Sequence, residues 1–296
     1  GRAGITTVIA LPASDPWGHG RHRKRRNNYF MEKLMTRRLA IYSAAFALVA
    51  NAAFAQTTGQ KPFEPQVGQA GKDVVWVPTP QAVVDKMLDM ANVTKADTVM
   101  DLGSGDGRTV ITAAKRGARG IGIEYNPDMV NLSKQNAAAA GVSDRATFIQ
   151  ADLFETDLSK ADVITMFLLP SINIKLRPKI LDLKPGTRIA SNTFTMEDWQ
   201  ADETATVTDG CSSSWCTALF WIVPAKVAGT WNTPNGALTL TQNFQMLSGT
   251  LGNQAVQGRL RGNEITLTAG NQKWSGTVNG NSIQFTSPSA MTATKK

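Results

Sequence analysis

The chain has 296 residues and a formal net charge of +8, from 31 lysines and arginines against 23 aspartates and glutamates. The excess lies at one end, because residues 1–55 hold 9 basic and 2 acidic residues whereas residues 56–296 hold 22 and 21. Nucleic-acid binding needs a basic face, so the near neutrality of residues 56–296 argues against a nucleic-acid partner.

The first 34 residues contain the basic cluster RHRKRR and show no sustained periodicity. We interpret residues 1–34 as an upstream extension that is not part of the mature protein. Both histidines, His19 and His22, lie within it. A mature chain without histidine cannot run a Ser-His-Asp or Cys-His mechanism, and we expect no metal site in it.

Residues 35–55, MTRRLAIYSAAFALVANAAFA, have the pattern of a secretory signal peptide. Two arginines precede an apolar run of about a dozen residues, and Ala53 and Ala55 flank a cleavage position. We therefore expect cleavage after Ala55, a mature chain that starts at Gln56, and a periplasmic or secreted location. No stretch reaches the ~18 apolar residues of a membrane-spanning helix, so no transmembrane segment is expected in the mature chain.

Residues 56–75 are polar and rich in glycine and proline, which predicts a flexible lead-in. An ordered domain is predicted over residues 76–224. Thr79 is placed to cap a helix that begins at Pro80. Apolar residues then recur at helical spacing: Val84, Met87, Leu88 and Ala91.

Apolar strands and helices alternate along the next hundred residues. Strands are predicted at 98–101, 120–124, 146–150, 162–168 and 187–192, and helices at 107–117, 127–140 and 172–183, with a short helical turn before 162. Strands that are apolar throughout and separated by helices predict a parallel sheet covered on both faces, with a ligand at the carboxyl ends of the strands. A last pair of strands, TATVTDG and TALFWIVPA, is predicted to close the sheet as an antiparallel hairpin.

The run DLGSGDGR, residues 101–108, stands between the first of these strands and a helix. Gly103, Gly105 and Gly107 let the backbone turn sharply and let a ligand approach the main chain at a helix N-terminus. A dinucleotide fingerprint needs a glycine where this chain has Arg108, so an NAD-linked oxidoreductase is the weaker interpretation. Asp101 suits a ligand with a cationic ammonium, because a carboxylate would repel a pyrophosphate.

This acid-x-Gly-x-Gly-x-Gly pattern resembles motif I of the class I, seven-strand S-adenosylmethionine-dependent methyltransferases, and the resemblance extends over roughly residues 76–224. It implies that Glu124, at the end of the second strand, holds the ribose hydroxyls, and that Asp152, after the third strand, contacts adenine. It also suggests that Thr79 contacts the methionine end of the cofactor. Other interpretations remain open: a solvated strand end for Glu124, a helix cap formed by Asp152 and Glu155, and simple capping for Thr79.

The segment after the fourth strand, MFLLPSIN, departs from the Asn/Asp-Pro-Pro-Tyr loop with which DNA and glutamine methyltransferases hold a planar amide or amino group. A base-amine or amide acceptor is therefore disfavoured. The surrounding sequence is similar to bacterial methyltransferase-domain proteins and, distantly, to lysine methyltransferases with a DLGSGDGR motif. The residues proposed for the acceptor side are Asn192, Glu197, Asp198 and Trp199, although a role in capping and core packing is an equal alternative.

Cys211 and Cys216 lie five positions apart in DGCSSSWC. They are interpreted as a disulfide that closes a hairpin loop in an oxidising compartment, forming a local clamp remote from the cofactor. A reduced, inert pair is the alternative.

Residues 225–296 form a separate unit with 6 basic residues and a single acid, Glu264. Short alternating runs separated by Asn-Gly and Gly-Asn turns predict β-hairpins. The weak repeat of LSGTLGN and WSGTVNG suggests one hairpin used twice, in a small antiparallel sheet or partial barrel. It is expected to pack on the preceding domain or to recognise an acidic or polymeric partner.

The sequence thus predicts an α/β protein with a doubly wound, mostly parallel, Rossmann-like seven-strand sheet, followed by a small antiparallel all-β domain. The resemblance implies an enzyme that uses S-adenosyl-L-methionine to methylate an acceptor, an amine of a protein or small molecule. The alternative is an exported, non-catalytic binding protein that retains the fold and the affinity for S-adenosylmethionine or a nucleoside.

Overall fold

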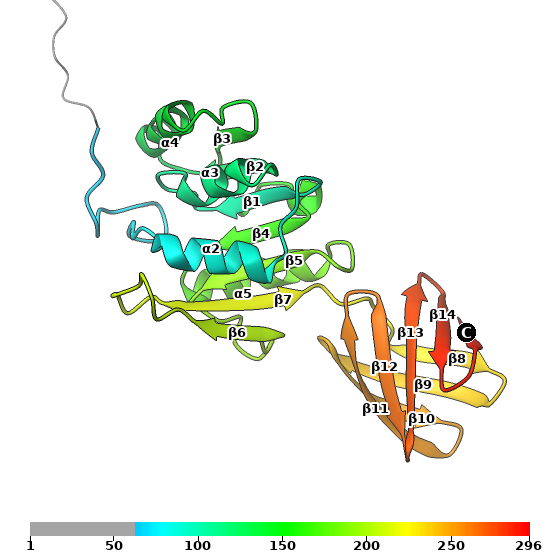
Figure 1. The fold of residues 1–296 in the computed structure, drawn as a ribbon. Helices are drawn as coiled ribbons and strands as arrows, with labels where there is room; N and C mark the ends of the chain where they lie inside the picture. Colours follow the sequence, from blue (N-terminus) through cyan, green and yellow to red (C-terminus); the bar gives the residue numbers. More distant parts are fainter. Residues whose placement is uncertain (1–62) are drawn as a thin grey trace, which may run out of the picture. The chain divides into compact units, whose positions relative to one another are not determined.

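The computed structural model describes residues 63–296 (Figure 1). The proposed extension at 1–34, the signal peptide at 35–55 and the cleavage after Ala55 lie outside the described residues.

Residues 98–222 form a 7-stranded sheet with the order β3-β2-β1-β4-β5-β7-β6. The first five strands along the chain pair in parallel, and β7 is antiparallel to both β5 and β6. The strands are β1 (Thr98–Leu102), β2 (Arg119–Glu124), β3 (Ala146–Gln150), β4 (Val163–Met166), β5 (Arg188–Asn192), β6 (Glu203–Thr206) and β7 (Thr217–Ile222). The predicted doubly wound sheet with its antiparallel closing hairpin is confirmed.

Helices cover both faces of this sheet (Figure 1). They are α2 (Gln81–Met90), α3 (Arg108–Lys115), α4 (Pro127–Ala139) and α5 (Pro170–Leu181), with a short 3-10 turn, η1 (Leu158–Lys160). Because side chains alternate along a strand, Val99 packs with α2 and α3 whereas its neighbour Met100 packs with α5 on the opposite face. Asp101, next in this alternation, accepts a hydrogen bond from Thr165 of β4.

Two local predictions before the sheet are wrong. The helix α2 begins at Gln81 with Pro80 as its N-cap and no capping side chain, so Thr79 lies one residue too early to cap it. The predicted flexible lead-in is also ordered in its second half. Residues 66–76 form a hairpin, here called the 66–76 hairpin. The N–H of Trp76 donates to the carbonyl oxygen of Gln69, and the carbonyl oxygen of Trp76 accepts from the N–H of Gly68.

The carboxyl-terminal unit is a closed antiparallel barrel rather than an open sheet, with the order β10-β11-β12-β13-β14-β15-β8-β9. Its strands are β8 (Gly229–Thr233), β9 (Gly236–Asn243), β10 (Met246–Leu251), β11 (Gln254–Arg261), β12 (Glu264–Ala269), β13 (Gln272–Asn279), β14 (Ser282–Ser287) and β15 (Met291–Lys295). The two copies of the repeat fall on β10 and β13 and the turns after them. Closure removes the exposed strand edges, and alternate side chains fill the interior, among them Trp231, Leu260 and Ile283.

Three of the six basic residues of 225–296 pair with acids of the preceding domain. Arg261 lies 2.8 Å from Glu203, Arg259 pairs with Asp202, and Lys226 pairs with Asp182. Part of the positive charge is thus compensated inside the chain, which favours the packing interpretation of this unit over recognition of an acidic partner.

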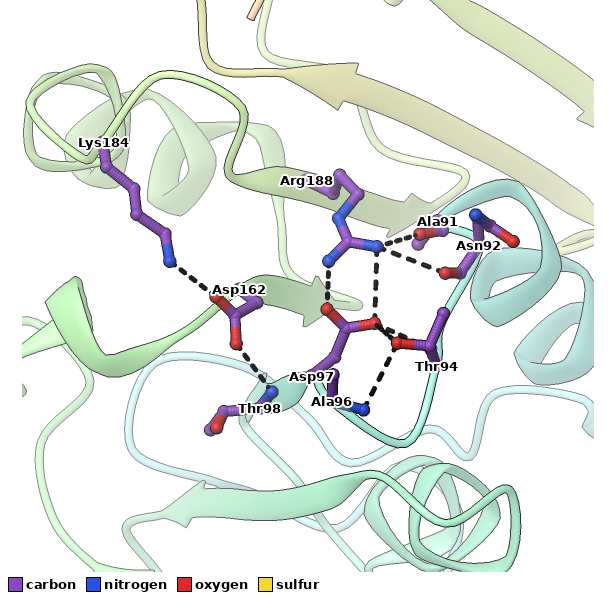
Figure 2. Close-up of polar contacts among 9 residues, drawn as sticks. All are labelled: Ala91, Asn92, Thr94, Ala96, Asp97, Thr98, Asp162, Lys184 and Arg188. Carbon is purple, nitrogen blue, oxygen red and sulfur yellow. Dashed lines mark hydrogen bonds and ion pairs between the residues drawn. The ribbon is translucent and has the colours of Figure 1, made fainter.

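A polar cluster ties together the amino ends of β1, β4 and β5 (Figure 2). Arg188, at the start of β5, pairs with Asp97 and donates to the carbonyl oxygen of Ala91 at 2.8 Å. Although burial opposes it, the hydrogen bonds from Arg188 and Thr94 hold the pKa of Asp97 below its usual range. This ion pair therefore fixes β5 against the start of β1, at the edge of the sheet opposite the carboxyl ends.

Replacing Arg188 with methionine is expected to lower the free energy of unfolding by about 2–3 kcal/mol at pH 7, because Asp97 stays buried without its cation. The stabilisation by Asp97 is complete above the ordinary pKa of about 3.9 and is lost as the pH falls through its lowered folded-state pKa. The deficit should therefore shrink below about pH 4. Urea unfolding at both pH values measures it.

The matched control is Lys226→Met, which breaks an ion pair with both side chains largely exposed. This change is expected to stay within about 0.5 kcal/mol. Equal losses for the two variants would contradict the role given to the Asp97–Arg188 pair.

Candidate active site

A cavity of about 220 Å³ opens at the carboxyl ends of β1, β2, β3 and β4. Six of the seven residues predicted to bind the cofactor line it: Thr79, Asp101, Gly103, Gly105, Glu124 and Asp152. The parallel register brings them together, because Leu102 pairs with both Ile123 of β2 and Met166 of β4.

The glycine turn has the conformation that its sequence predicts. Gly105 has φ of +54°, and a Cβ atom there would lie 2.6 Å from Nε1 of Trp76 in the 66–76 hairpin. Gly107, the one predicted residue that does not line the cavity, has φ of +84° and packs so closely that a Cβ atom would lie 2.8 Å from the ring of Phe148. Gly105 thus admits the tryptophan over the turn, and Gly107 allows α3 to pack against β3.

Asp101 is the most perturbed carboxyl group of the cavity. Only 7% of the residue is exposed, and the hydroxyl of Thr165 donates to its Oδ1 at 2.7 Å. Burial raises the pKa of Asp101 to about 7, because the cost of desolvating the carboxylate outweighs the lowering of the pKa by the hydrogen bonds from Thr165 and Thr109. A cationic group bound beside Asp101 would restore its charged form.

Glu124 ends the second strand and Asp152 follows the third, as predicted, and both hold nearby main-chain groups. Glu124 accepts hydrogen bonds from the backbone N–H of Gly105 at 3.0 Å and of Asn126 at 2.9 Å. Asp152 accepts a hydrogen bond from the N–H of Phe154 at 2.9 Å in a turn, and no helix starts there, so the alternative of a helix cap with Glu155 does not hold. Carboxylate oxygens with lone pairs to spare are suited to hydroxyl and amino donors.

The 66–76 hairpin forms one side of the cavity through contacts that the sequence did not predict. Lys72 pairs with Asp152, and this hydrogen bond holds the pKa of Asp152 below its usual range. The Lys72 ammonium also lies 5.0 Å from the ring centre of Tyr125, an exposed aromatic residue next to Glu124. Arg108 adds a second tie, because it pairs with Asp106 and donates to the carbonyl oxygen of Thr79 at 3.0 Å.

None of the four residues proposed for the acceptor side lines the cavity. Trp199 is fully buried against Trp221, which is the core-packing alternative. Asn192 is also fully buried, and its side-chain oxygen accepts a hydrogen bond from Thr193 at 2.9 Å. Glu197 and Asp198 are exposed, and Asp198 pairs with Arg177.

The same loop instead contributes Phe194, which lines the cavity together with Phe167 and Trp215. Trp215 lies in the loop closed by Cys211 and Cys216, whose sulfur atoms are bonded at 1.98 Å. The sequence predicted that the disulfide loop is remote from the cofactor. That prediction is wrong, because the loop contributes to the wall of the cavity. The position of Trp215 in the cavity wall could not be predicted from its place beside a cysteine, because the distance from this loop to β4 depends on the order of the strands in the sheet.

Neither a metal centre nor a membrane-spanning helix is found in the part of the chain that the structure describes. Within residues 63–296, no group of at least 3 His, Cys, Asp or Glu side chains is arranged to hold a metal ion. Over the same residues, no helix is both long and apolar enough to cross a membrane.

Comparisons with known proteins agree with this architecture. The profile of the family described as ANTKMT methyltransferase domain matches residues 101–203. A protein-lysine N-methyltransferase of Saccharolobus islandicus (strain REY15A) is 44% identical over 140 residues, which cover 46% of this chain and 87% of that relative. The adenine nucleotide translocase lysine N-methyltransferase of Mus musculus is 35% identical over 119 residues, which cover 40% of this chain and 51% of that relative.

A solved structure is also similar to part of this chain. The chain has 47% identity and a TM-score of 0.48 to an RNA methyltransferase from Salinibacter ruber in complex with S-adenosyl-L-homocysteine, covering 51% of this chain and 96% of that one.

A seven-strand sheet of this order, with a glycine turn after β1 and acids at the ends of β1 and β2, is the architecture of an S-adenosylmethionine-dependent methyltransferase. The chain belongs to the class I methyltransferase family that includes the archaeal relative. Its cofactor is S-adenosyl-L-methionine, and the cavity residues fit that molecule. Asp101 suits the methionine ammonium, Glu124 the ribose hydroxyls, and the apolar side chains of Met129 and Leu153 offer surface for a purine.

Cofactor affinity is expected to fall as the medium becomes acidic, because Asp101 must be ionised to face the ammonium and its pKa lies at about 7. The dissociation constant of S-adenosylhomocysteine should rise about tenfold from pH 8 to pH 6. Titration calorimetry at these pH values tests this.

Asp101→Asn is the control, because it keeps the shape and removes the titration. It should bind more weakly at pH 8 and show little change down to pH 6. A wild-type dissociation constant that is the same at pH 6 and pH 8 would refute the assignment of Asp101 to the ammonium.

Proposed function

We propose that this chain transfers the methyl group of S-adenosylmethionine to an amine, the side-chain amino group of a protein lysine. The observation that carries the proposal is the apolar lining of the cavity after β4. Leu168 and Leu169 occupy the positions from which a side-chain amide or a tyrosine would hydrogen-bond a planar acceptor, and Ile172 extends the apolar surface. The archaeal and mouse relatives are named lysine methyltransferases, which supports an amine of this kind.

The residues of the chain position and desolvate the reactants. Asp101 and Glu124 would hold the cofactor at its ammonium and ribose, and the apolar residues after β4 exclude water from the approaching amine. The cofactor supplies a sulfonium methyl group, whose carbon–sulfur bond breaks with its electron pair left on sulfur as the amine nitrogen bonds to carbon. The nitrogen loses its proton to water, so no strong base is required from the protein.

The competing possibility is a binding protein that keeps the cofactor but transfers no methyl group. Turnover separates the two. The purified full-length chain is incubated with methyl-labelled cofactor and a periplasmic protein extract, with total RNA as a parallel acceptor. The label should enter protein as methyl-lysine.

The rate of methyl transfer should rise up to about tenfold per pH unit between pH 7 and 9, because a lysine of ordinary pKa near 10.4 attacks only as the neutral amine.

Glu124→Ala should lose about 1.5–3 kcal/mol of the free energy of cofactor binding. Glu155→Ala, an exposed carboxylate outside the cavity, is its matched control. Label in RNA alone would contradict the amine acceptor, and cofactor binding without label in any fraction would favour the binding protein.

We also propose that the protein acts outside the cytoplasm, in the periplasm or as a secreted protein, after cleavage behind Ala55. The signal-peptide pattern of residues 35–55 and the bond between Cys211 and Cys216 support this proposal.

The exported product is expected to begin at Gln56 and to contain no free thiol. Intact-mass analysis of the periplasmic fraction before and after alkylation tests both statements. The proposal would be contradicted by a cytoplasmic product that retains residues 1–55, or by a product in which both cysteines are alkylated without prior reduction.

A further inference from the structure

Three aromatic side chains form a continuous cluster on the cavity lining, here called the aromatic wall: Phe167, Phe194 and Trp215. The ring centres of Phe167 and Phe194 lie 5.8 Å apart in a stacked arrangement. Trp215 lies 5.3 Å from Phe194 and 5.8 Å from Phe167, tilted against both. All three are in mutual contact, so they present one surface rather than three isolated rings.

Each ring of the aromatic wall belongs to a loop residue beside the end of a different strand, and these strand ends lie at the same edge of the sheet. Phe167 directly follows β4, and Phe194 follows β5 by two positions. Trp215 precedes β7, and since β7 is antiparallel to β5, with Ala218 opposite Asn192, the start of β7 meets the end of β5. The sheet order thus assembles the aromatic wall beside the glycine turn.

The aromatic wall differs from the aromatic core of the chain. Trp199, Trp221 and Trp231 are fully buried, whereas the rings of the aromatic wall are only half-buried and border an open cavity. Apolar surface left facing water in a cavity is unfavourable by roughly 25 cal/mol per Å². A ligand that covers these rings would recover this free energy, which is typical of a binding site.

The backbone that carries Phe194 is held in a constrained conformation. Its carbonyl oxygen accepts hydrogen bonds from the hydroxyl of Ser191 at 2.8 Å and from the side-chain amide of Asn173 at 3.3 Å. Thr193, immediately before it, has φ of +60°, a left-handed conformation that a β-branched residue rarely adopts. Such constrained residues concentrate at ligand sites.

Trp215 lies inside the loop that the disulfide closes. The connection between β6 and β7 spans residues 207–216, and the Cys211–Cys216 bond closes the half of it that contains Trp215. Cys211 packs against the cluster of Val83 and Met87 on α2, which anchors the closed loop to the domain. Within the loop, the N–H of Trp215 donates to the hydroxyl of Ser213 at 3.1 Å.

We propose that the aromatic wall is the acceptor subsite, that it binds an alkylamine side chain, and that the Cys211–Cys216 disulfide positions Trp215 within it. This inference rests on the proposed function and deepens it. An alkylamine has an apolar stem that packs on ring faces, and its ammonium is attracted to the π surface before it loses its proton to water. Desolvation against the rings then favours the neutral, nucleophilic amine.

The test measures binding of poly-L-lysine to the oxidised full-length chain in the presence of saturating S-adenosylhomocysteine, which requires no turnover. Trp215→Ala is expected to weaken this binding roughly tenfold, as for the loss of a desolvated cation–π contact. Trp215→Phe should restore most of it, and Phe167→Leu should weaken it as Trp215→Ala does. Phe63→Ala, which removes an exposed ring outside the cavity, should bind as the wild type does.

The dissociation constant of S-adenosylhomocysteine should change less than about twofold in every variant, and this measurement also verifies that each variant is folded. Where methyl transfer to poly-L-lysine is seen, Trp215→Ala should raise KM and leave kcat nearly unchanged. Wild-type binding without transfer would refute the proposed function and leave the subsite standing. No wild-type binding, or equal binding by Trp215→Ala, would refute the subsite.

The positioning role of the disulfide has its own readout. The double variant Cys211→Ser with Cys216→Ser, and the wild type after reduction, should both lose poly-L-lysine affinity to the extent that Trp215→Ala does. Combining the double variant with Trp215→Ala should add no further loss, because both act through the same ring. A double variant that binds poly-L-lysine as the oxidised wild type does would overturn this role.

Discussion

The parallel pairing of β1 with both β2 and β4 is the constraint on which the rest of the site depends. It sets Leu102 opposite Ile123 on one side and Met166 on the other, so the residues that end three strands meet at one edge. Asp101 and Glu124 bring carboxyl groups to that edge, and Phe167 brings the first ring of the aromatic wall. The opposite ends of the strands are held by a separate ion pair, between Arg188 and Asp97.

The sequence was sufficient for the fold because its patterns and its glycine turn agree with each other. Apolar strands of about five residues separated by helices predict a covered parallel sheet, and the acid-glycine run marks a strand whose carboxyl end borders the cavity. Asp101, Glu124 and Asp152 could be placed near the site because each lies at or near the carboxyl end of an apolar strand, where the resemblance implies cofactor contacts. These residues owe their positions to the strand they terminate, which is local information.

The remaining residues of the site could not be predicted, because their positions depend on which strands are neighbours. Trp215 is far from Phe167 in sequence and approaches it only through the insertion of β7 between β5 and β6. Lys72 belongs to a polar segment whose composition indicates a flexible lead-in, yet the structure places it in a hairpin that pairs with Asp152. The residues proposed for the acceptor side lie in the loop after β5, but Trp199 belongs to the core, and the residue of this loop that lines the cavity is Phe194.

The disulfide connects the site with the leader pattern of residues 35–55. The antiparallel pair of β6 and β7 fixes only the ends of the 207–216 connection, and a loop of that length loses considerable entropy when it must hold one ring against two others. The covalent closure of residues 211–216 reduces the conformational entropy of the unfolded chain, which stabilises the fold by about 2 kcal/mol in the chain-entropy account. Less of the entropy cost of ordering the loop then has to be met when a ligand binds. Such a bond forms in an oxidising compartment. A chain exported as proposed would therefore complete its acceptor subsite after it leaves the cytoplasm, which separates cofactor binding, built from strand ends, from acceptor binding, built in part by oxidation.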